Sequence, residues 1–131
     1  MIVLDTHAWI WWVGDPAQIS PAAAVRIAAE SERGGIQVSA ISCWEISLLA
    51  RKGRLVLTLE VADWIAKTEA LPFVHFVPVD NHIALRSNSL PGDLHDDPAD
   101  RLIVATALTL GATLITKDAR LIAYPHVETL W

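Results

Sequence analysis

The sequence predicts an α/β protein in which helices cover both faces of a central parallel sheet of four to five strands. Short apolar runs alternate with longer segments of helical periodicity along the 131 residues. Strands that alternate with helices pair in parallel, because each crossover helix returns the chain to the same edge of the sheet. The right-handedness of such crossovers then gives a three-layer α/β/α sandwich.

Five segments are predicted to be strands. They are residues 1–4, residues 36–40 after the turn Gly34-Gly35, residues 75–79, residues 113–116, and a short strand near Val127. The strand at residues 75–79 is the least strongly predicted, because Pro78 has no N–H to donate to a neighbouring strand.

Helices are predicted between these strands. Ser20-Pro21 and Asp97-Pro98 each combine an N-cap residue with a proline at the first helical position. The second of these helices runs to Leu110, ends at Gly111 and is apolar nearly all round, so we expect it to be buried on two sides. The remaining helices are expected at residues 6–12, from Ser42 to about Lys52, at residues 61–71, and from near Asp80.

Composition indicates one core-rich domain over residues 1–131. Hydrophobic residues make up 53% and charged residues 19% of the chain, which excludes general disorder. The lone Cys43 excludes an internal disulfide and a thiolate zinc site, and we expect it to be a small buried hydrophobe. The start of the chain lacks a basic signal-peptide region, and the longest apolar run falls short of the roughly 18 residues of a membrane span. These features predict a cytoplasmic protein with no membrane partner.

The net charge of −5 argues against a plain DNA-binding module. It does not exclude a nuclease whose acids hold metal cations, because bound cations invert the local charge.

Acidic residues stand where the predicted strands end and the predicted helices begin. Asp5 ends the first strand, Glu45 follows Ser42 by three residues, Asp97 and Asp100 open the long buried helix, and Asp118 follows the fourth strand by two residues. Because ligands of such sheets bind at the carboxyl ends of the strands, we expect these acids to share one edge. Carboxylate oxygens are the ligands that Mg²⁺ and Mn²⁺ prefer, so the sequence predicts a metal site there.

Each acid also has a structural interpretation. Glu45 is the partner of Ser42 in a capping box, Asp97 is an N-cap, Asp100 is a first-turn acid, and Asp118 caps the turn that follows it. Taken singly, these interpretations are favoured for every acid except Asp5, whose only local role is to cap the helix that follows it. Taken together, they leave the common location of the acids unexplained.

The segments VLDTHAWIWW, SAISCWEISLLARKGRL, DDPADRLIVATAL and TLITKDARL resemble, in order and spacing, the motifs of the PIN-domain family, and most of all its VapC-type toxins. The resemblance covers nearly the whole chain and implies a metal-dependent endoribonuclease on a PIN-like sandwich. It implies an RNA substrate, a cognate antitoxin and a homodimer. By the same resemblance, the catalytic and metal-binding acids are Asp5, Glu45, Asp100 and Asp118, with Thr6, Asp97 and Thr116 as auxiliary residues.

The chemistry of hydrolysis gives these acids different roles. A bound Mg²⁺, or alternatively Mn²⁺, activates water and stabilises charge on the phosphate. We assign Asp5 and Asp100 as the leading metal ligands, and Glu45 and Asp118 as ligands through water or a second metal. Because the four carboxylates repel one another, one or more should have a raised pKa without metal.

Basic residues allow two interpretations. Arg51, Lys52 and Arg54 form the only basic cluster, at a predicted helix C-terminus where the dipole favours cations. The functional alternative is contact with RNA phosphates. Arg101 and Lys117 adjoin the third and fourth acids and pair either with them or with phosphate.

Three tryptophans crowd the first predicted helix. Trp9 and Trp12 share a face, and Trp11 points elsewhere. Core packing is the default, an exposed part would contact the antitoxin or a second copy, and base stacking is the third and least supported option. His7 and His95 lie near the acids and are expected to be surface or capping residues.

Other functions remain as alternatives. A phosphatase of the HAD type also begins with a strand that ends in Asp, but its D-x-D motif would need an acid where His7 stands. A receiver domain would need a pair of acids at the first strand, which is absent. A non-catalytic PIN-like module that binds RNA or protein is disfavoured by the presence of all four acids, and a housekeeping nuclease by the compact size.

Overall fold

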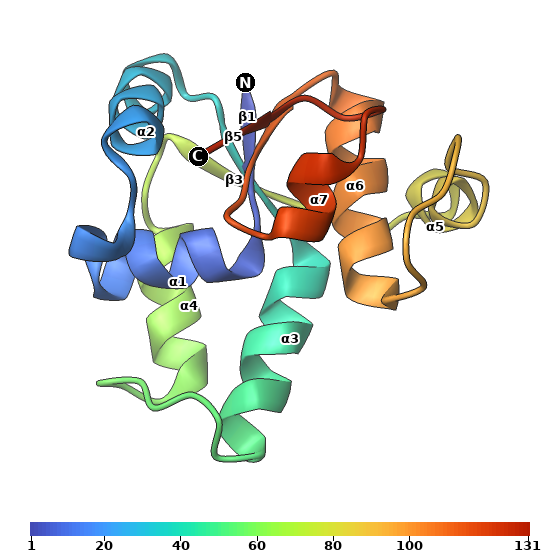
Figure 1. Cartoon of the computed structure of the whole chain (residues 1–131). Helices are drawn as coiled ribbons and strands as arrows, with labels where there is room; N and C mark the ends of the chain where they lie inside the picture. Colours follow the sequence, from blue (N-terminus) through green and yellow to red (C-terminus); the bar gives the residue numbers. More distant parts are fainter.

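A five-stranded parallel sheet forms the middle layer of the computed structural model, which describes all 131 residues (Figure 1). Its strands are β1 (Ile2–Leu4), β2 (Ile36–Ser39), β3 (Val74–Val77), β4 (Thr113–Ile115) and β5 (Thr129–Leu130), in the order β3-β2-β1-β4-β5. The central strand β1 pairs with β2 and β4, so that Leu4 lies beside Val38 and Ile115. This arrangement confirms the predicted parallel sheet.

Helices cover both faces of the sheet, which confirms the three-layer sandwich (Figure 1). They are α1 (Thr6–Gly14), the 3-10 turn η1 (Pro16–Gln18), α2 (Pro21–Arg33), α3 (Ala40–Arg51), α4 (Val61–Glu69), α5 (Asn81–Ser87), α6 (Pro98–Leu110) and α7 (Ala119–Ala123). Helices α1, α2 and α4 lie on one side, and α5, α6 and α7 on the other. Helix α3 starts at the sheet and extends away from it. None of the helices has the length and apolar character that a membrane-crossing segment requires.

Alternation along β1 divides the core into two halves. Ile2 and Leu4 are fully buried in the cluster under α1, α2 and α4, whereas Val3 is fully buried in the cluster with α6 and α7. Successive strand side chains point to opposite faces, so a strand covered on both sides is apolar throughout. Helix α6 is buried as predicted, with Ile103 and Val104 at 0% exposure.

Local signals fixed several helix ends correctly. Ser20 accepts a hydrogen bond from Ala23 N with Pro21 at the first helical position, and Asp97 does the same for Asp100 N before α6. Gly111 ends α6 with a φ of 63°, a conformation that costs glycine little.

The beginning of α3 differs from the prediction, because Ser39 and not Ser42 is the N-cap. Ser39 has an extended backbone and its hydroxyl accepts a hydrogen bond from Ile41 N at 3.2 Å, so the helix starts at Ala40. The capping-box pairing of Ser42 with Glu45 is therefore wrong, and both side chains are free to face another element.

Smaller differences occur at other ends. Strand β3 stops at Val77 and so leaves Pro78 outside the ladder, and β5 begins at Thr129, two residues beyond the predicted position. The first helix continues to Gly14, and α4 stops at Glu69.

The carboxyl ends of the strands gather several helix starts at one edge of the sheet. Helix α1 follows β1, α3 follows β2, and α7 follows β4 after a three-residue connection. The start of α6 lies at the same lower edge in Figure 1. Helix N-termini favour negative charge, so this edge suits the acids that the sequence places there.

Candidate active site

Asp5 is fixed through both of its carboxylate oxygens. It is 6% exposed, between the end of β1 and the start of α1. Oδ1 accepts a hydrogen bond from Thr6 N at 2.8 Å and Oδ2 accepts one from the Thr116 hydroxyl at 2.7 Å. Burial raises the pKa of Asp5 even though both hydrogen bonds act to lower it.

Thr6 connects Asp5 to Glu45 on α3. Its hydroxyl donates to Glu45 Oε1 at 2.5 Å and lies 2.9 Å from Ser42 Oγ. The shifted start of α3 therefore turns Ser42 and Glu45 toward α1. Burial and the negative charges of Asp5 and Asp97 raise the pKa of Glu45, against the hydrogen bond from Thr6.

Thr116 connects Asp5 to Asp118. Its hydroxyl donates to Asp5 and also accepts a hydrogen bond from Asp118 N at 3.0 Å. Asp118 caps α7, since its Oδ1 accepts a hydrogen bond from Arg120 N at 2.8 Å. One buried hydroxyl thus sets the position of two acids.

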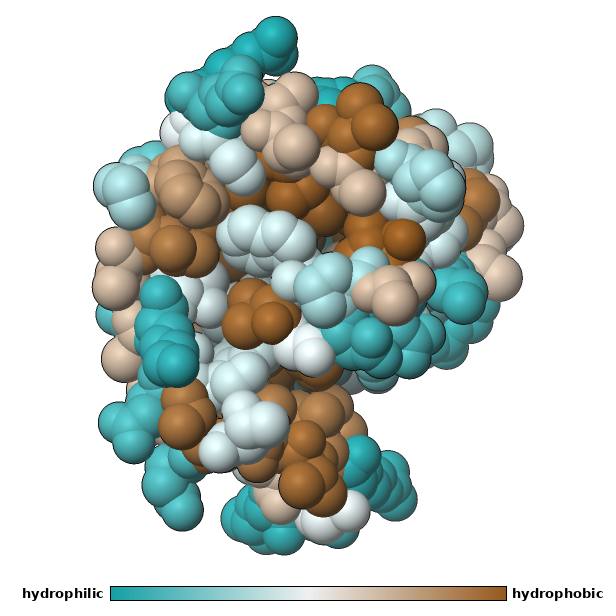
Figure 2. Space-filling view, turned by 90° about the vertical axis from the view of Figure 1, so that its left-hand side faces the viewer, coloured by the Kyte–Doolittle hydropathy of each residue, from teal (hydrophilic) through white to brown (hydrophobic).

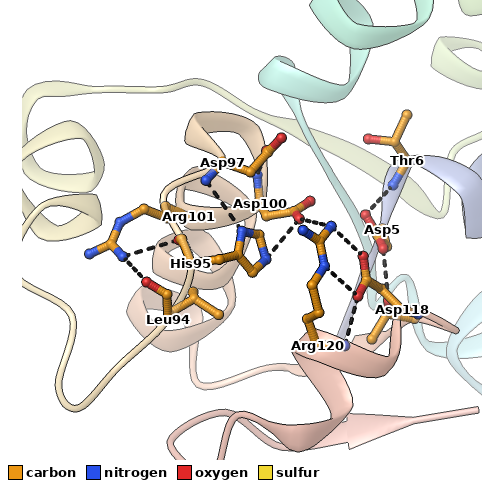
Figure 3. A network of polar contacts seen from close by, with 10 residues as sticks. Asp5, Thr6, Leu94, His95, Asp97, Asp100, Arg101, Asp118 and Arg120 are labelled. Carbon is orange, nitrogen blue, oxygen red and sulfur yellow. Dashed lines mark hydrogen bonds and ion pairs between the residues drawn. The ribbon is translucent and has the colours of Figure 1, made fainter.

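Arg120 lies between Asp118 and Asp100 (Figure 3). Its Nη2 is 3.2 Å from Asp118 Oδ2 and 3.5 Å from Asp100 Oδ2. Although partial burial acts to raise it, the hydrogen bonds and charge of Arg120 hold the pKa of Asp118 below its usual range. Burial and the repulsion of Asp5, Asp97, Asp118 and Glu45 raise the pKa of Asp100 to about 7.

His95 completes the network beside Asp100. Its Nδ1 accepts a hydrogen bond from Asp97 N at 3.2 Å, so the proton of the neutral ring is on Nε2. Nε2 is buried and 3.2 Å from Asp100 Oδ2, but it is not aligned for a hydrogen bond. His95 therefore holds the N-cap residue of α6 and also lies beside one of the acids.

The predicted basic residues are dispersed. Arg101 donates to the carbonyl oxygens of Ser87, Leu94 and His95, so it holds the loop before α6 and pairs with none of the acids. Lys117 is exposed, and its Nζ lies 5.7 Å from the centre of the Trp11 ring. The cluster Arg51, Lys52 and Arg54 lies at the end of α3 remote from the sheet (Figure 1).

The site has the donor chemistry of a divalent-cation site. Asp5, Glu45, Asp100 and Asp118 supply oxygen ligands of the kind that Mg²⁺ and Mn²⁺ prefer. A single guanidinium nitrogen reaches Asp100 and Asp118 together, so a single cation fits between them. As the side chains are oriented, no three His, Cys, Asp or Glu groups surround a common point closely enough to hold a metal ion. A cation that contacts both Asp100 and Asp118 would therefore take the place of the Arg120 guanidinium.

The structure adds contacts that the sequence analysis missed. Arg120 was not singled out, although it follows Asp118 by two residues in the turn that Asp118 caps. A second addition is a hollow of about 400 Å³ beside the acids, lined by Asp5, His7, Trp11, Lys117 and Asp118. The sequence signal for this hollow was the helical spacing, which places Trp11 on a different face from Trp9 and Trp12.

An acidic edge on a parallel α/β/α sandwich defines a class of proteins with a carboxylate-rich cation site. Within this class, the chain belongs to the PIN-domain family, whose model, described as "PIN domain", matches residues 2–127. A relative from Mycobacterium tuberculosis (strain ATCC 25618 / H37Rv), named Ribonuclease VapC22, is 36% identical over 132 residues. The match covers 99% of this chain and 98% of the relative.

Solved structures share the fold at low sequence identity. DNA-bound VapBC from Salmonella typhimurium matches with a TM-score of 0.70 and 17% identity, over 98% of this chain and 96% of that one. VapBC2 from Rickettsia felis, bound to a DNA fragment from the promoter, matches with a TM-score of 0.71 and 14% identity, over 99% of this chain and 98% of that one. FitAcB from Neisseria gonorrhoeae matches with a TM-score of 0.65 and 22% identity, over 100% of this chain and 97% of that one. At these identities the likeness supports the fold.

Proposed function

We propose that this protein is a metal-dependent endoribonuclease and the toxin of a type II toxin–antitoxin module. The observation that carries the proposal is the continuous contact network from Glu45 through Thr6, Asp5, Thr116, Asp118 and Arg120 to Asp100. The relative named Ribonuclease VapC22 supports the reaction class. The network places the acids where a parallel sheet binds its ligands.

We assign the metal to the four acids. Asp5 and Asp100 would be the direct ligands, with Glu45 and Asp118 acting through water or a second ion. Bound Mg²⁺ or Mn²⁺ would supply an activated water and would stabilise negative charge on the phosphate. With a pKa of about 7, Asp100 is partly protonated at neutral pH and would give up that proton on holding a cation.

The neighbouring polar residues orient these acids. Thr116 and Thr6 N–H hold the two oxygens of Asp5, which keeps its rotamer fixed before any cation arrives. The Thr6 hydroxyl donates to Glu45, and Asp97 caps α6 by accepting a hydrogen bond from Asp100 N. These three residues are therefore positioning residues in the proposal.

RNA contacts are assigned to two regions. Lys117 is exposed beside Asp5 and Asp118, within reach of a phosphate bound at the acids. Arg51, Lys52 and Arg54 are exposed at the far end of α3, so they would contact a remote part of the RNA. Phosphate contacts of this kind weaken with salt.

A protein antitoxin is the proposed partner. A solved structure that shares the fold, from Klebsiella pneumoniae, is a toxin–antitoxin complex. The face with α1, α2 and α4 exposes brown apolar side chains among teal polar ones (Figure 2). An apolar groove of about 350 Å³ lies near the end of α1, with Ile10, Leu55, Leu57 and Trp64 in its lining. Exposed Trp44 and Leu85 are further apolar surface for the homodimer that the resemblance implies.

Cleavage of a labelled single-stranded RNA tests the proposed activity. Purified wild-type protein should cut the RNA with Mg²⁺ or Mn²⁺ and should stop when EDTA is in excess. Asp5→Asn should abolish cutting, which controls for contaminating nucleases. Cutting in EDTA, or at the wild-type rate by Asp5→Asn, would overturn the proposal. For the toxin role, expression should arrest bacterial growth, and Asp5→Asn should relieve the arrest.

A further inference from the structure

The hollow beside Trp11 differs in its lining from the apolar groove near Trp64. Two acids of the proposed active site, Asp5 and Asp118, line it together with two aromatic residues, His7 and Trp11. The exposed Lys117 completes the lining. Its volume of about 400 Å³ falls in the ~300–1,000 Å³ range of small-molecule sites.

The Trp11 ring packs against two other aromatic rings. Its centroid is 5.7 Å from that of Trp131 and 5.8 Å from that of His7, with tilted planes in both pairs. Trp9 instead contacts Trp64 and Phe76, and Trp12 contacts Phe73, all of them in or against the core cluster of Ile2 and Leu4. Trp11 is therefore the tryptophan of α1 that is directed at the acidic edge rather than at the core.

Lys117 covers the Trp11 ring only loosely. Its Nζ stands 5.7 Å from the ring centre, close to the ~6 Å limit of a cation–π contact. Since Lys117 is exposed, its flexible chain can swing away without disturbing buried groups. The uncovered ring then offers a flat face, and the displaced ammonium remains near the acids as a partner for phosphate.

We propose that this hollow binds one base of single-stranded RNA, stacked on Trp11, next to the phosphate that is cut; this rests on the proposed function. The bases on either side of a phosphate at Asp5 belong to the nucleotides that this phosphate joins, so they lie close to it. The lining of the hollow includes both Asp5 and Trp11. Bases stack on aromatic rings whatever their sequence. A protein segment with apolar side chains would fit the apolar groove near Trp64 better than this charged hollow.

Binding of five-nucleotide RNAs with a single abasic position, scanned along the chain, tests the proposal. The background is Asp100→Asn with Mg²⁺ present, which prevents cutting and leaves the hollow intact, because Asp100 is not in its lining. Removal of one particular base should weaken binding about tenfold, and Trp11→Leu should weaken binding of the intact RNA by the same factor. In Trp11→Leu the penalty for that abasic position should vanish.

Matched variants separate stacking from structural damage. Trp12→Leu on the same helix should keep the full abasic penalty, and Trp11→Phe, which retains a ring, should recover most of the affinity. Equal abasic penalties in the presence and absence of Trp11 would overturn the base site, even if wild-type protein cuts RNA. The base site would also be overturned if Trp11→Leu left the affinity for RNA unchanged and abolished binding of a protein partner. If the abasic penalty depends on Trp11 but the wild-type protein cuts no RNA, the base site stands and the proposed nuclease activity is overturned.

Discussion

Arg120 Nη2 lies 3.5 Å from Asp100 Oδ2 while it pairs with Asp118 at 3.2 Å. The guanidinium therefore competes with any divalent cation for the carboxylates of Asp100 and Asp118. Arg120 is 61% exposed, so its release costs little, and exposed pairs of this kind contribute only about 0.2–1 kcal/mol. The contact offsets part of the negative charge of the two acids, and a competing cation can displace it.

Removal of Arg120 should strengthen metal binding. Arg120→Gln eliminates the positive charge that competes with a divalent ion for Asp100 and Asp118, and the energy of an exposed pair corresponds to at most about a fivefold gain in affinity. Titration of Mn²⁺ by calorimetry checks this. Arg86→Gln, which removes a charge on α5 outside the acidic network, should leave the affinity unchanged. Weaker Mn²⁺ binding by Arg120→Gln would contradict the competition.

Stability without divalent metal should fall as pH rises from about 4 to about 7. The pKa of Asp100 rises from 3.8 to about 7 in the folded protein, so the folded state binds more protons than the unfolded state across this window. Asp5 and Glu45 act in the same direction, and Asp118, with its lowered pKa, acts in the opposite one. Urea midpoints measured in EDTA at pH 5 and pH 8 check the sign. Asp100→Asn should flatten the dependence, and a wild-type midpoint that is higher at pH 8 would contradict it.

Loss of the Thr116 hydroxyl should damage both activity and stability. Thr116→Val removes the hydrogen bond to Asp5 and leaves Asp118 N–H without its acceptor, a change that costs roughly 1–3 kcal/mol. We also expect roughly a 10- to 100-fold loss in cleavage rate, as for groups that orient metal ligands. Thr106→Val is the matched control, because Thr106 is buried in α6 and bonds only the Leu102 carbonyl. Equal rates in the two variants would refute the positioning role.

Trp9 should carry much of the stability of α1. It is 0% exposed, its Nε1 donates to the Thr68 hydroxyl at 3.1 Å, and its ring contacts Trp64 and Phe76. Trp9→Ala should lower the free energy of unfolding by about 3–5 kcal/mol. Trp44→Ala, at a site 55% exposed, should change it by no more than about 0.5 kcal/mol. Urea denaturation measures both, and similar losses would contradict the burial argument.

The sequence predicted those features that depend on neighbouring residues. Ser20-Pro21 and Asp97-Pro98 began helices because N-caps and first-turn prolines act within three residues. The alternation of apolar runs predicted the sheet. The predicted start of α3 at Ser42 was wrong because Ser39 and Ser42 are both able to cap a helix, and the apolar pattern does not distinguish them.

The side-chain contacts of the site depended on tertiary structure. The four acids were predicted to share an edge, and the structure connects them through Thr6, Thr116 and Arg120. The link between Arg120 and Asp100 joins α7 to α6 and depends on a flexible side chain, so no local pattern contains it. Arg101 adjoins Asp100 in sequence, yet it donates to the Ser87 carbonyl at the end of α5 and to the Leu94 and His95 carbonyls of the loop before α6.

Cleavage of 5′-labelled single-stranded RNA by Asp100→Asn, with Asp93→Asn as its matched control, tests the central claim most directly. Asp100 is buried in the acidic network, whereas Asp93 is exposed in the loop before α6. With Mg²⁺, Asp93→Asn should cut at the wild-type rate, and Asp100→Asn should be at least about 100-fold slower. Equal rates for Asp100→Asn and wild type would contradict a nuclease at this acidic edge.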